Sequence, residues 1–580
     1  MALAPTAVIF SRSSAELGVR IAAAVDGQAI EASAQNLIPA MQSAFAERRA
    51  IVAVAATAII IRALASKLGS KFTDPPVICV SRDGAHVIPL LGLHHGGSHL
   101  ADRIAAALNV PAVHSNGTAQ IGSIPIYDPG HGFVMGNVDN YQSFALSLMS
   151  GEKVHIDGDA PWLNALPRSE DARLKVTVTE KLLLGSDEHL IFHPSTLAVG
   201  VGCERGTSPT EVEELIANTL ARHGLAEASV ACHASIELKA DEPAISNLKE
   251  VRFFTIDELN AQEARLLTPS EAVRAEVGVA GVAEAAALAA AGPRSELIVA
   301  KTKSQHATCA VARAASPIID MRGRQRGTLY VIGIGPGGRD FRSPEASLAL
   351  WRCSEWVGYW LYLDLVSDLK QADQTEHRFP LGAEEDRVRH AIALAKQGKR
   401  VALICSGDAG IYAMAALVYE VIDLEPCRIA VNVIPGISAF QAAAAKAGAM
   451  IGHDFCCISL SDLLTPWEVI EKRLKAAAEG DFVVSFYNPR SMKRRDQLER
   501  AFAILSQHRQ PDTPVVIASN LGRLEEKVRI VRFADFNPDD VDMLTLVMVG
   551  SSQSKSFVRG DGRTYAYTPR GYARKRDHAE

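Results

Sequence analysis

Short apolar runs alternate along this chain with longer amphipathic stretches, a pattern that is typical of βαβ units built on parallel sheets. We therefore expect an α/β fold. Before residue 320, the runs that predict strands are 7–10, 51–61, 76–80, 197–202, 228–233, 296–300 and 306–312. The stretches that predict helices in the same half are 99–108, 210–223 and the alanine-rich segment 276–291.

The clearest internal boundary lies near residue 320. The sequence AASP at 314–317 is followed by the basic RGRQRG at 322–327, and a strand-like run begins at 328. Charge, glycine and proline between apolar segments are typical of a linker. We therefore predict divisions at 1–135, 136–194, 195–313, 314–327, 328–558 and 559–580, in which 136–194 is an irregular connection, 314–327 a linker and 559–580 a tail.

Composition places the chain among ordinary globular proteins. Its 580 residues predict about four domains at about 150 residues each. The apolar fraction of 48% and the charged fraction of 22% exclude a disordered chain. The longest mainly apolar run, 51–61, has 11 residues, whereas a membrane span needs about 20. Residues 1–17 lack the pattern of a signal peptide, so we expect a cytoplasmic protein that does not interact with membranes.

Charge and cysteine usage exclude two further classes. The net charge of -6 gives no electrostatic support for a nucleic-acid partner. The nine cysteines contain no Cys-x-x-Cys pair, which indicates reduced thiols rather than a zinc site. His94, His95 and His99 lie close together, but no second cluster of ligands has metal-binding spacing, so we predict no metal.

Three glycine-containing turns, at 333–338, 405–410 and 434–439, each follow an apolar strand directly. Ligands bind at the carboxyl ends of parallel strands, and glycine lets the backbone approach them closely. We therefore expect the three turns to line one cleft. The first fits Gly-x-Gly-x-x-Gly, but in the region 353–359 the acidic residue, Glu355, comes before the second strand and not after it, and Pro336 lacks the N–H that a pyrophosphate needs. A dinucleotide site is disfavoured.

The region from about 327 to 556 resembles the tetrapyrrole methyltransferases that use S-adenosylmethionine, and within them the precorrin-3B C(17)-methyltransferases of cobalamin synthesis. The matching segments are GIGPG at 333–337, SGDAGIY at 406–412, PGISA at 435–439, SLSDLLTPW at 459–467, FYNPRS at 486–491 and TYAYTPRGY at 564–572. The resemblance implies a two-lobed α/β methylase fold with S-adenosylmethionine in the cleft, a homodimer, and methylation of carbon 17 of precorrin-3B with ring contraction to precorrin-4.

The resemblance also implies which residues bind the cofactor. They are Pro336, Ser406, Gly407, Asp408, Ile411, Ser438, Ala439, Tyr487 and Gly522. A carboxylate such as Asp408 can accept hydrogen bonds from a cationic cofactor, or it can cap its own turn. Both interpretations remain open.

Methyl transfer from a sulfonium depends mainly on positioning, so we expect no conventional catalytic triad. Ring contraction can use an acid or a base, and Ser461, Asp462 and Tyr487 are the candidates, none of which the sequence selects. Arg490, Lys493, Arg494 and Arg495 are candidates for binding substrate carboxylates. The alternative is a solvated helix start in which Asp496 and Glu499 pair with them.

The first half resembles the cobalt-precorrin-5A hydrolase family known as CbiG, over about 5–125, and its smaller C-terminal relative CobE, over about 195–312. The segments that carry this resemblance are 54–62, 71–77, 87–97, GVGCERGTS at 200–208 and ASIELKADEP at 234–243. Cys203, Arg205, Lys239, Asp241 and Glu242 form either a polar site at strand ends or a capped turn.

One departure from that family bears on activity. HSNGT stands at 114–118, where the family has Thr-Thr-Ala-Thr-Asp, so an aspartate is missing. The first half is then either a hydrolase or a carrier that hands on a corrinoid intermediate. The overall alternative is a methyltransferase for another tetrapyrrole, with the first half a non-catalytic scaffold.

Overall fold

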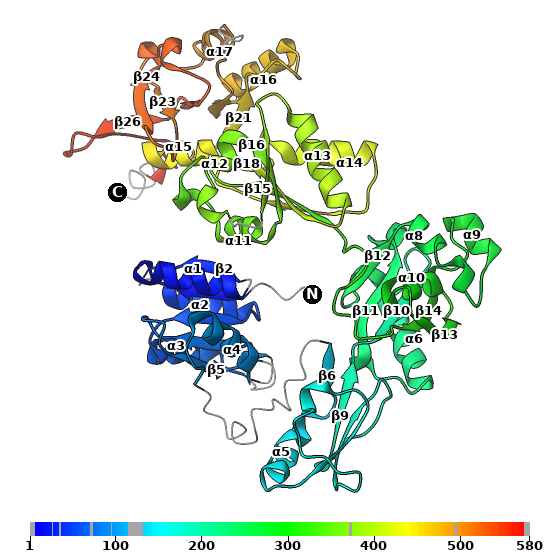
Figure 1. The fold of residues 1–580 in the computed structure, drawn as a ribbon. Coiled ribbons are helices and arrows are strands. Elements are labelled where there is room, and N and C mark those ends of the chain that lie inside the picture. The colour runs from blue at the N-terminus through cyan, green and yellow to red at the C-terminus, as the bar shows by residue number, and fades with distance from the viewer. Residues whose placement is uncertain are drawn as a thin grey trace. The chain divides into compact units, whose positions relative to one another are not determined.

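The computed structural model describes residues 6–25, 27–33, 36–69, 74–93, 96–113, 132–370, 374–491 and 496–572. The chain forms two compact units, Met1–Gln325 and Arg326–Glu580. Both units consist of β-sheets with helices packed against them (Figure 1), which confirms the predicted α/β class.

The first sheet of the first unit has the strand order β2-β1-β3-β4-β5. Its strands are β1 (Ala7–Phe10), β2 (Gln28–Glu31), β3 (Ile51–Val54), β4 (Val77–Val80) and β5 (Val87–Leu91). Its helices are α1 (Ala15–Ala24), α2 (Leu37–Ala46), α3 (Thr57–Leu64) and α4 (Gly97–Leu108). Strands β1 to β4 run parallel and β5 is antiparallel to β4. Every residue of β1, β3 and β4 is buried, as a parallel sheet covered on both faces requires.

The prediction of a strand over 51–61 is wrong in its second part. Strand β3 ends at Val54, and helix α3 begins at Thr57. In α3 the buried residues are Ile60, Ala63 and Leu64, whereas Ile61 is 55% exposed. A short apolar run carries no periodicity that separates a buried strand from the start of an amphipathic helix.

The segment 136–194, predicted to be irregular, contains regular structure with its own core. Strands β6 (Phe133–Met135), β7 (Val154–Asp157), β8 (Leu174–Val178) and β9 (His189–Pro194) form a sheet of order β6-β9-β8-β7, covered by helix α5 (Tyr141–Met149). Phe144, Leu190 and Phe192 are fully buried in it. The strands are short and separated by polar turns, which hid them in the sequence.

The third sheet of the unit has the order β12-β11-β10-β14-β13. Its strands are β10 (Leu197–Cys203), β11 (Val230–Ile236), β12 (Val251–Phe254), β13 (Glu296–Lys303) and β14 (Ala307–Arg313), and the helices of this region are α6 (Pro209–Arg222), α7 (Pro243–Ser246), α8 (Ile256–Asn260), α9 (Glu271–Val277) and α10 (Val282–Ala291). The helix predicted over 276–291 is therefore two helices. Gly278, with φ 76°, ends α9 before α10 begins.

The second unit begins with a fully parallel sheet of order β17-β16-β18-β15-β19, which we call the first lobe (residues 328–434). Its strands are β15 (Thr328–Gly333), β16 (Glu355–Tyr359), β17 (Thr375–Phe379), β18 (Arg400–Cys405) and β19 (Ala430–Ile434). Helices α13 (Glu384–Lys396) and α14 (Met414–Leu424) pack on one face, and α11 (Pro344–Arg352) and α12 (Trp360–Asp364) on the other.

The second lobe (residues 455–549) has a sheet of order β21-β22-β25-β23-β24, in which only β21 and β22 pair in parallel. Its elements are β21 (Phe455–Ser459), β22 (Val483–Tyr487), β23 (Pro514–Ser519), β24 (Lys527–Arg532), β25 (Thr545–Val549), α16 (Trp467–Glu479) and α17 (Gln497–Leu505). The parallel pairing that the sequence predicts is therefore limited here to one pair of strands. Helix α15 (Ala439–Ala447) follows β19 and packs against β23 and β25.

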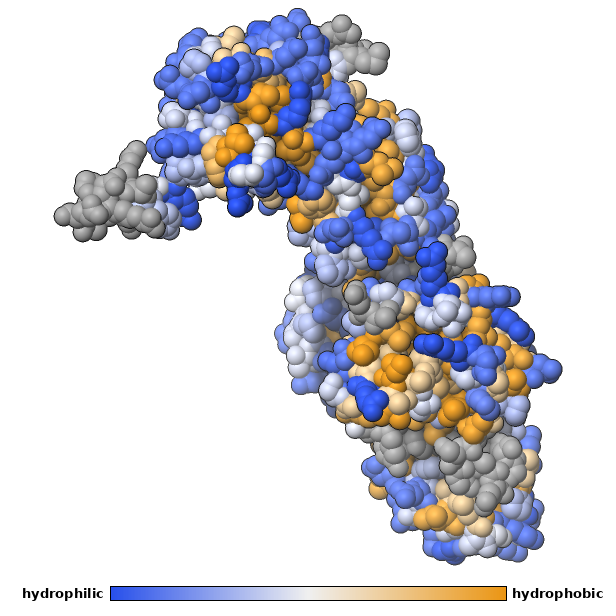
Figure 2. Space-filling model, turned by 90° about the vertical axis from the view of Figure 1, so that its left-hand side faces the viewer, coloured by the Kyte–Doolittle hydropathy of each residue, from blue (hydrophilic) through white to orange (hydrophobic). Residues whose placement is uncertain are grey.

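A small sheet of β20 (Gly448–Ala449), β26 (Lys555–Val558) and β27 (Thr564–Tyr567) extends into the predicted tail, because β27 lies after residue 559. Figure 2 shows apolar patches lying between hydrophilic areas on one face of the molecule. Scattered apolar surface of this kind is ordinary in globular proteins. Among the helices of the described residues, none combines the length and the apolar character that crossing a membrane requires.

Candidate functional site

The three glycine turns meet at the carboxyl edge of the first-lobe sheet, after the adjacent strands β18, β15 and β19. A Cβ on Gly436 would stand 2.1 Å from the Gly407 carbonyl oxygen, and one on Gly333 would stand 2.7 Å from the same atom. Gly335 N–H also donates to Gly407 O at 3.1 Å. These backbones pack so closely that side chains at Gly333 and Gly436 are excluded.

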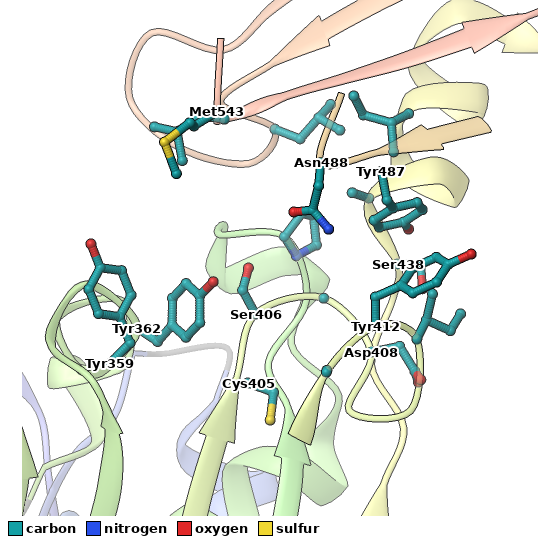
Figure 3. A pocket seen from close by; sticks show the side chains of 18 of the residues that line it. Tyr359, Tyr362, Cys405, Ser406, Asp408, Tyr412, Ser438, Tyr487, Asn488 and Met543 are labelled. Atoms are coloured by element: carbon teal, nitrogen blue, oxygen red, sulfur yellow. The ribbon is translucent and has the colours of Figure 1, made fainter. Parts of the chain in front are cut away.

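A cavity of about 400 Å³ opens above these turns, within the size range of small-molecule sites. Eight of the nine predicted cofactor residues line it, namely Pro336, Ser406, Gly407, Asp408, Ile411, Ser438, Ala439 and Tyr487. Figure 3 shows Tyr359 and Tyr362 at one end, Tyr412, Tyr487 and Ser438 at the other, and Ser406 between them. Both lobes therefore contribute side chains to one cavity.

Gly407 presents bare backbone to this space. Its φ is 69°, and a Cβ there would have no neighbour nearer than 4.0 Å, the closest being Ser438 and Ala439. The absence of a side chain leaves room against the β18 turn. Any side chain would occupy that room and would strain the backbone.

Asp408 ties two of the turns together. Its Oδ1 accepts a hydrogen bond from Gly410 N–H at 2.8 Å, and its Oδ2 accepts one from Gly436 N–H at 3.0 Å. The carboxylate thus caps its own turn while lining the cavity. Each carboxylate oxygen has a second lone pair that remains for a ligand.

The aromatic end of the cavity is formed by Tyr412 and Tyr487, whose ring centroids lie 5.3 Å apart. Tyr487 hydroxyl accepts from Phe440 N–H at 3.4 Å, and Tyr412 hydroxyl donates to Cys457 O at 2.9 Å. Burial raises the pKa of Tyr487 to about 12. Its hydroxyl therefore stays protonated near neutral pH.

The opposite end contains residues that the sequence did not single out. Arg387 and Arg523 line the cavity together with Tyr359 and Tyr362. A signal for Arg387 was present, because it falls on the buried stripe of α13, four residues before the buried Ala391. Arg523 follows Gly522 in the loop after β23, and only its position beside a predicted residue marked it.

Three other predicted residues lie away from the cavity lining. Gly522 packs on the first lobe, where a Cβ would stand 2.5 Å from Gly338 N. Asp462 accepts from Gln497 Nε2 at 2.9 Å, and Ser461 N–H donates to Ser459 Oγ at 3.3 Å. Tyr487 is the one member of the predicted acid or base set that lines the cavity.

The predicted substrate-binding arginine, Arg490, is already engaged. Its guanidinium donates to Asp539 Oδ1 and to Pro538 O, each at 2.7 Å. It is not part of the cavity lining. Lys493, Arg494 and Arg495 lie outside the described residues, so their role stays a prediction.

The turn after β10 in the first unit gathers the polar residues predicted there. Arg205 Nη1 donates to Asp241 Oδ1 at 2.7 Å and lies 3.6 Å from Glu242 Oε2, and Arg205 Nη2 donates to Leu238 O. Gly206 N–H also donates to Glu242 at 3.3 Å. The arginine is thus paired with two carboxylates within the fold.

The histidine cluster and the departure from the CbiG pattern are only partly visible. His94, His95 and the segment 114–118 lie outside the described residues. Within the described part of the chain, no group of three or more His, Cys, Asp or Glu side chains is arranged to hold a metal ion.

Comparison with protein-family models divides the chain into three matched regions. Residues 328–537 match the model for tetrapyrrole (corrin/porphyrin) methylases. Residues 39–118 match "Cobalamin synthesis G N-terminal", and residues 197–312 match "Cobalamin synthesis G C-terminus". The chain thus joins regions similar to two kinds of cobalamin-synthesis protein, as the sequence motifs predicted.

Individual relatives agree with this division. A "Probable cobalt-factor III C(17)-methyltransferase" of Salmonella typhimurium is 46% identical over 42% of this chain and 99% of its own. A "Precorrin-3B C(17)-methyltransferase" of a Sinorhizobium species is 39% identical over 43% of this chain and 98% of its own. A "Cobalt-factor III methyltransferase" of Priestia megaterium is 42% identical over 43% of this chain, and the match spans 46% of that longer relative.

Proposed function

Because this chain belongs to the tetrapyrrole methylases, we propose that its second unit methylates carbon 17 of precorrin-3B, or of its cobalt-containing counterpart, with S-adenosylmethionine as methyl donor and with contraction of the macrocycle. The relatives named for these two substrates support both forms, and the metal content of the macrocycle is left open. The cavity between the two lobes is the site of this reaction.

The residues around the cavity fit S-adenosylmethionine. The open backbone at Gly407 leaves space where a Cβ would intrude, and Asp408 offers carboxylate oxygens to a cationic ligand. Pro336 lacks an N–H, which suits a cofactor without phosphates. Six residues of the cavity lining would hold the cofactor, namely Ser406, Gly407, Asp408, Ile411, Ser438 and Ala439. Pro336 would lie at the floor of the cavity, and Tyr487 would lie beside the aromatic part of the cofactor.

When bound, S-adenosylmethionine supplies an electrophilic methyl group on a positively charged sulfur. The protein's contribution is to hold the acceptor carbon in line with that group and to exclude water. The two lobes do this by enclosing one cavity from both sides. Tyr487, with a pKa near 12, can donate a hydrogen bond at neutral pH but cannot act as a base.

The observation that carries this proposal is the bare backbone of Gly407 above the packed glycine turns. Gly407→Ala tests it, with Gly562→Ala as the matched control, because both residues have positive φ and open surroundings and only Gly407 lines the cavity. We expect S-adenosylmethionine affinity, measured by calorimetry, to fall at least about tenfold in the first variant.

Product analysis tests the reaction itself. Full-length protein is incubated with methyl-labelled S-adenosylmethionine and precorrin-3B, and mass spectrometry follows the label into the macrocycle. Absence of cofactor binding, or of labelled product with either form of the substrate, contradicts the proposal.

For the first unit we propose a corrinoid-handling role, supported by its two matches to the cobalamin synthesis G family. A hydrolase releases acetaldehyde from the lactone of a ring-contracted intermediate, whereas a carrier does not. Assaying the full chain for acetaldehyde separates the two. A homodimer formed through the second unit is also proposed, and analytical ultracentrifugation tests it.

A further inference from the structure

The cavity lining includes two arginines, and it has a tyrosine at the end opposite Ser438 and Tyr487. Tyr362 lies at that end (Figure 3), and Arg387 and Arg523 line the same cavity. Burial raises the pKa of Tyr362, and the charges of Arg523 and Arg387 act on it in the opposite direction. Both arginines and Tyr362 belong to one cavity lining, which also includes Glu384.

Arg387 is buried with almost no charge compensation. Its side chain is 3% exposed, and its one carboxylate contact is to Glu384, 3.4 Å away and itself 40% exposed. Among the described residues, its buried Nε has no hydrogen-bond partner. A guanidinium has five N–H donors, so most of its donor capacity is unused.

Arg523 reaches the cavity from the second lobe. Its Nε donates to Pro336 O at 3.1 Å and its Nη2 to Ser406 Oγ at 3.3 Å. Both acceptors are neutral, and none of the described carboxylates forms an ion pair with it. These bonds hold the guanidinium in place without neutralising it.

Another buried arginine of the first lobe has its charge compensated by a carboxylate and serves as a comparison. The side chain of Arg342 is 5% exposed, and it donates to both carboxylate oxygens of Asp368, at 2.9 and 2.6 Å. Buried charges are costly unless they are paired. Among the described residues, Arg387 has only the 3.4 Å contact to Glu384 and Arg523 has no carboxylate partner, so an anion from outside can complete their pairing.

We propose that Arg387 and Arg523, which share a cavity with Tyr362, bind a carboxylate side chain of the tetrapyrrole substrate. This inference rests on the proposed function and names the group that orients the substrate in that site. Planar guanidinium groups pair with carboxylates in a two-pronged geometry. The role predicted for Arg490 passes to these residues, since Arg490 is already paired with Asp539.

A carboxylate can also come from the methionine part of the cofactor, so the test must separate the two sources. Arg387→Met and Arg523→Met each remove a charge and keep an apolar side chain of similar length. Arg342→Met is the matched control, because it removes a buried arginine of the same lobe that does not line the cavity. Arg387→Lys keeps the positive charge but loses the planar guanidinium group.

Three ligands are titrated into each full-length variant. The probe for the substrate site is uroporphyrin, followed by quenching of protein fluorescence, and coproporphyrin, with fewer carboxylates, is the comparison. S-adenosylmethionine is titrated by calorimetry. We expect Arg387→Met and Arg523→Met to weaken uroporphyrin binding about tenfold or more. Arg387→Met should leave cofactor affinity within about twofold, whereas Arg523→Met also removes the hydrogen bonds to Pro336 and Ser406 of the cofactor site. Arg387→Lys recovers part of the loss, and Arg342→Met binds both ligands normally.

Steady-state kinetics adds a readout that a purely structural role would not move. In Arg387→Met, KM for the tetrapyrrole rises while KM for S-adenosylmethionine stays unchanged, and thermal stability is not reduced. The proposal is overturned if cofactor affinity falls instead, if uroporphyrin binding is unaltered or absent in the wild type, or if stability is lost as in Arg342→Met.

Failure of the proposed function would give a different set of binding and activity results. A wild-type protein that binds uroporphyrin in an Arg387-dependent manner but transfers no methyl group contradicts the function and supports the carboxylate site. A wild-type protein that methylates precorrin-3B, and whose Arg387→Met variant keeps the same tetrapyrrole KM, supports the function and contradicts the carboxylate site.

Discussion

Strand β10 of the first unit and strand β18 of the second unit both end in cysteine, at Cys203 and Cys405, and both run into a glycine-containing turn. Arginine lies near each turn. Arg205 in the first unit is paired with Asp241 and Glu242. In the second unit, Arg387 has one long contact to a carboxylate and Arg523 has none among the described residues.

The turn of the first unit has carboxylate partners for its own arginine, whereas in our proposal the arginines near the turn of the second unit pair with a ligand. When the charges balance inside the fold, removing one of them leaves its partner buried and alone. When positive charges line a cavity and have no close carboxylate partner, they add little to the stability of the fold and most to the binding of an anionic ligand. The charge balance at a strand end is therefore more informative about function than the residue types found there.

We expect the largest effect on folding stability when a glycine of each turn is replaced by alanine. Gly436→Ala places a Cβ 2.1 Å from a backbone oxygen, so we expect a loss of about 3 kcal/mol or more in the second unit. Gly206 has φ 78° and open surroundings, so Gly206→Ala costs the first unit about 1 kcal/mol. Hydrogen-exchange mass spectrometry measures both turns separately, and equal losses would contradict the difference in packing.

The next effect compares a paired and an unpaired arginine. Arg205→Met leaves the Glu242 carboxylate, 3% exposed, without its guanidinium, and because Arg205 is half exposed we expect a cost of about 1 kcal/mol. Arg387→Met is expected to be neutral or stabilising. Urea denaturation followed by pulse proteolysis gives both values. A greater loss in Arg387→Met would mean that this arginine supports the fold.

A weaker effect follows from acid titration in the first lobe. The hydrogen bond from Arg342 lowers the pKa of Asp368, so this pair stabilises the folded state above the unfolded pKa of about 4, and the stabilisation is lost as pH falls through the folded value. Arg342→Met should therefore be less stable at pH 6 and show a flatter decline toward pH 3. Arg387→Met should keep the wild-type slope, and a flattened slope there would reveal a hidden carboxylate partner.

The smallest effect concerns the two cysteines that end the strands. Burial raises the pKa of Cys405 to about 11, and its side chain is 2% exposed. Burial also raises the pKa of Cys203, but Lys239 opposes it and the thiol is partly exposed. At pH 8, iodoacetamide should modify Cys203 before Cys405, as followed by peptide mass spectrometry. The reverse order would show that the cavity admits the reagent to a reactive thiol.

The glycine turns could be predicted from the sequence, because close backbone approach leaves a local signature, and the family resemblance supplied eight residues of the cavity lining. Gly333 and Gly436 tolerate no side chain at all. Local signals were weaker where apolar runs are short. The run 51–61 concealed a change from strand to helix, and the sheet within 136–194 has strands of only four to six residues after Met135.

The charge balance could not be predicted, because it depends on contacts between distant segments. Arg490 is paired with Asp539, 49 residues away in sequence. Arg523 reaches Ser406 across 117 residues. Arg387 lies in a charged helix that resembles a solvated surface, and only its place on the buried stripe distinguishes it.

The position of the Arg523 side chain depends on the absence of a side chain at Gly337. A Cβ at 337 would stand 2.4 Å from Arg523 Cγ, so the arginine can cross between the lobes only over a residue without a side chain. A side chain at 337 would therefore displace a positive charge that belongs to another part of the chain.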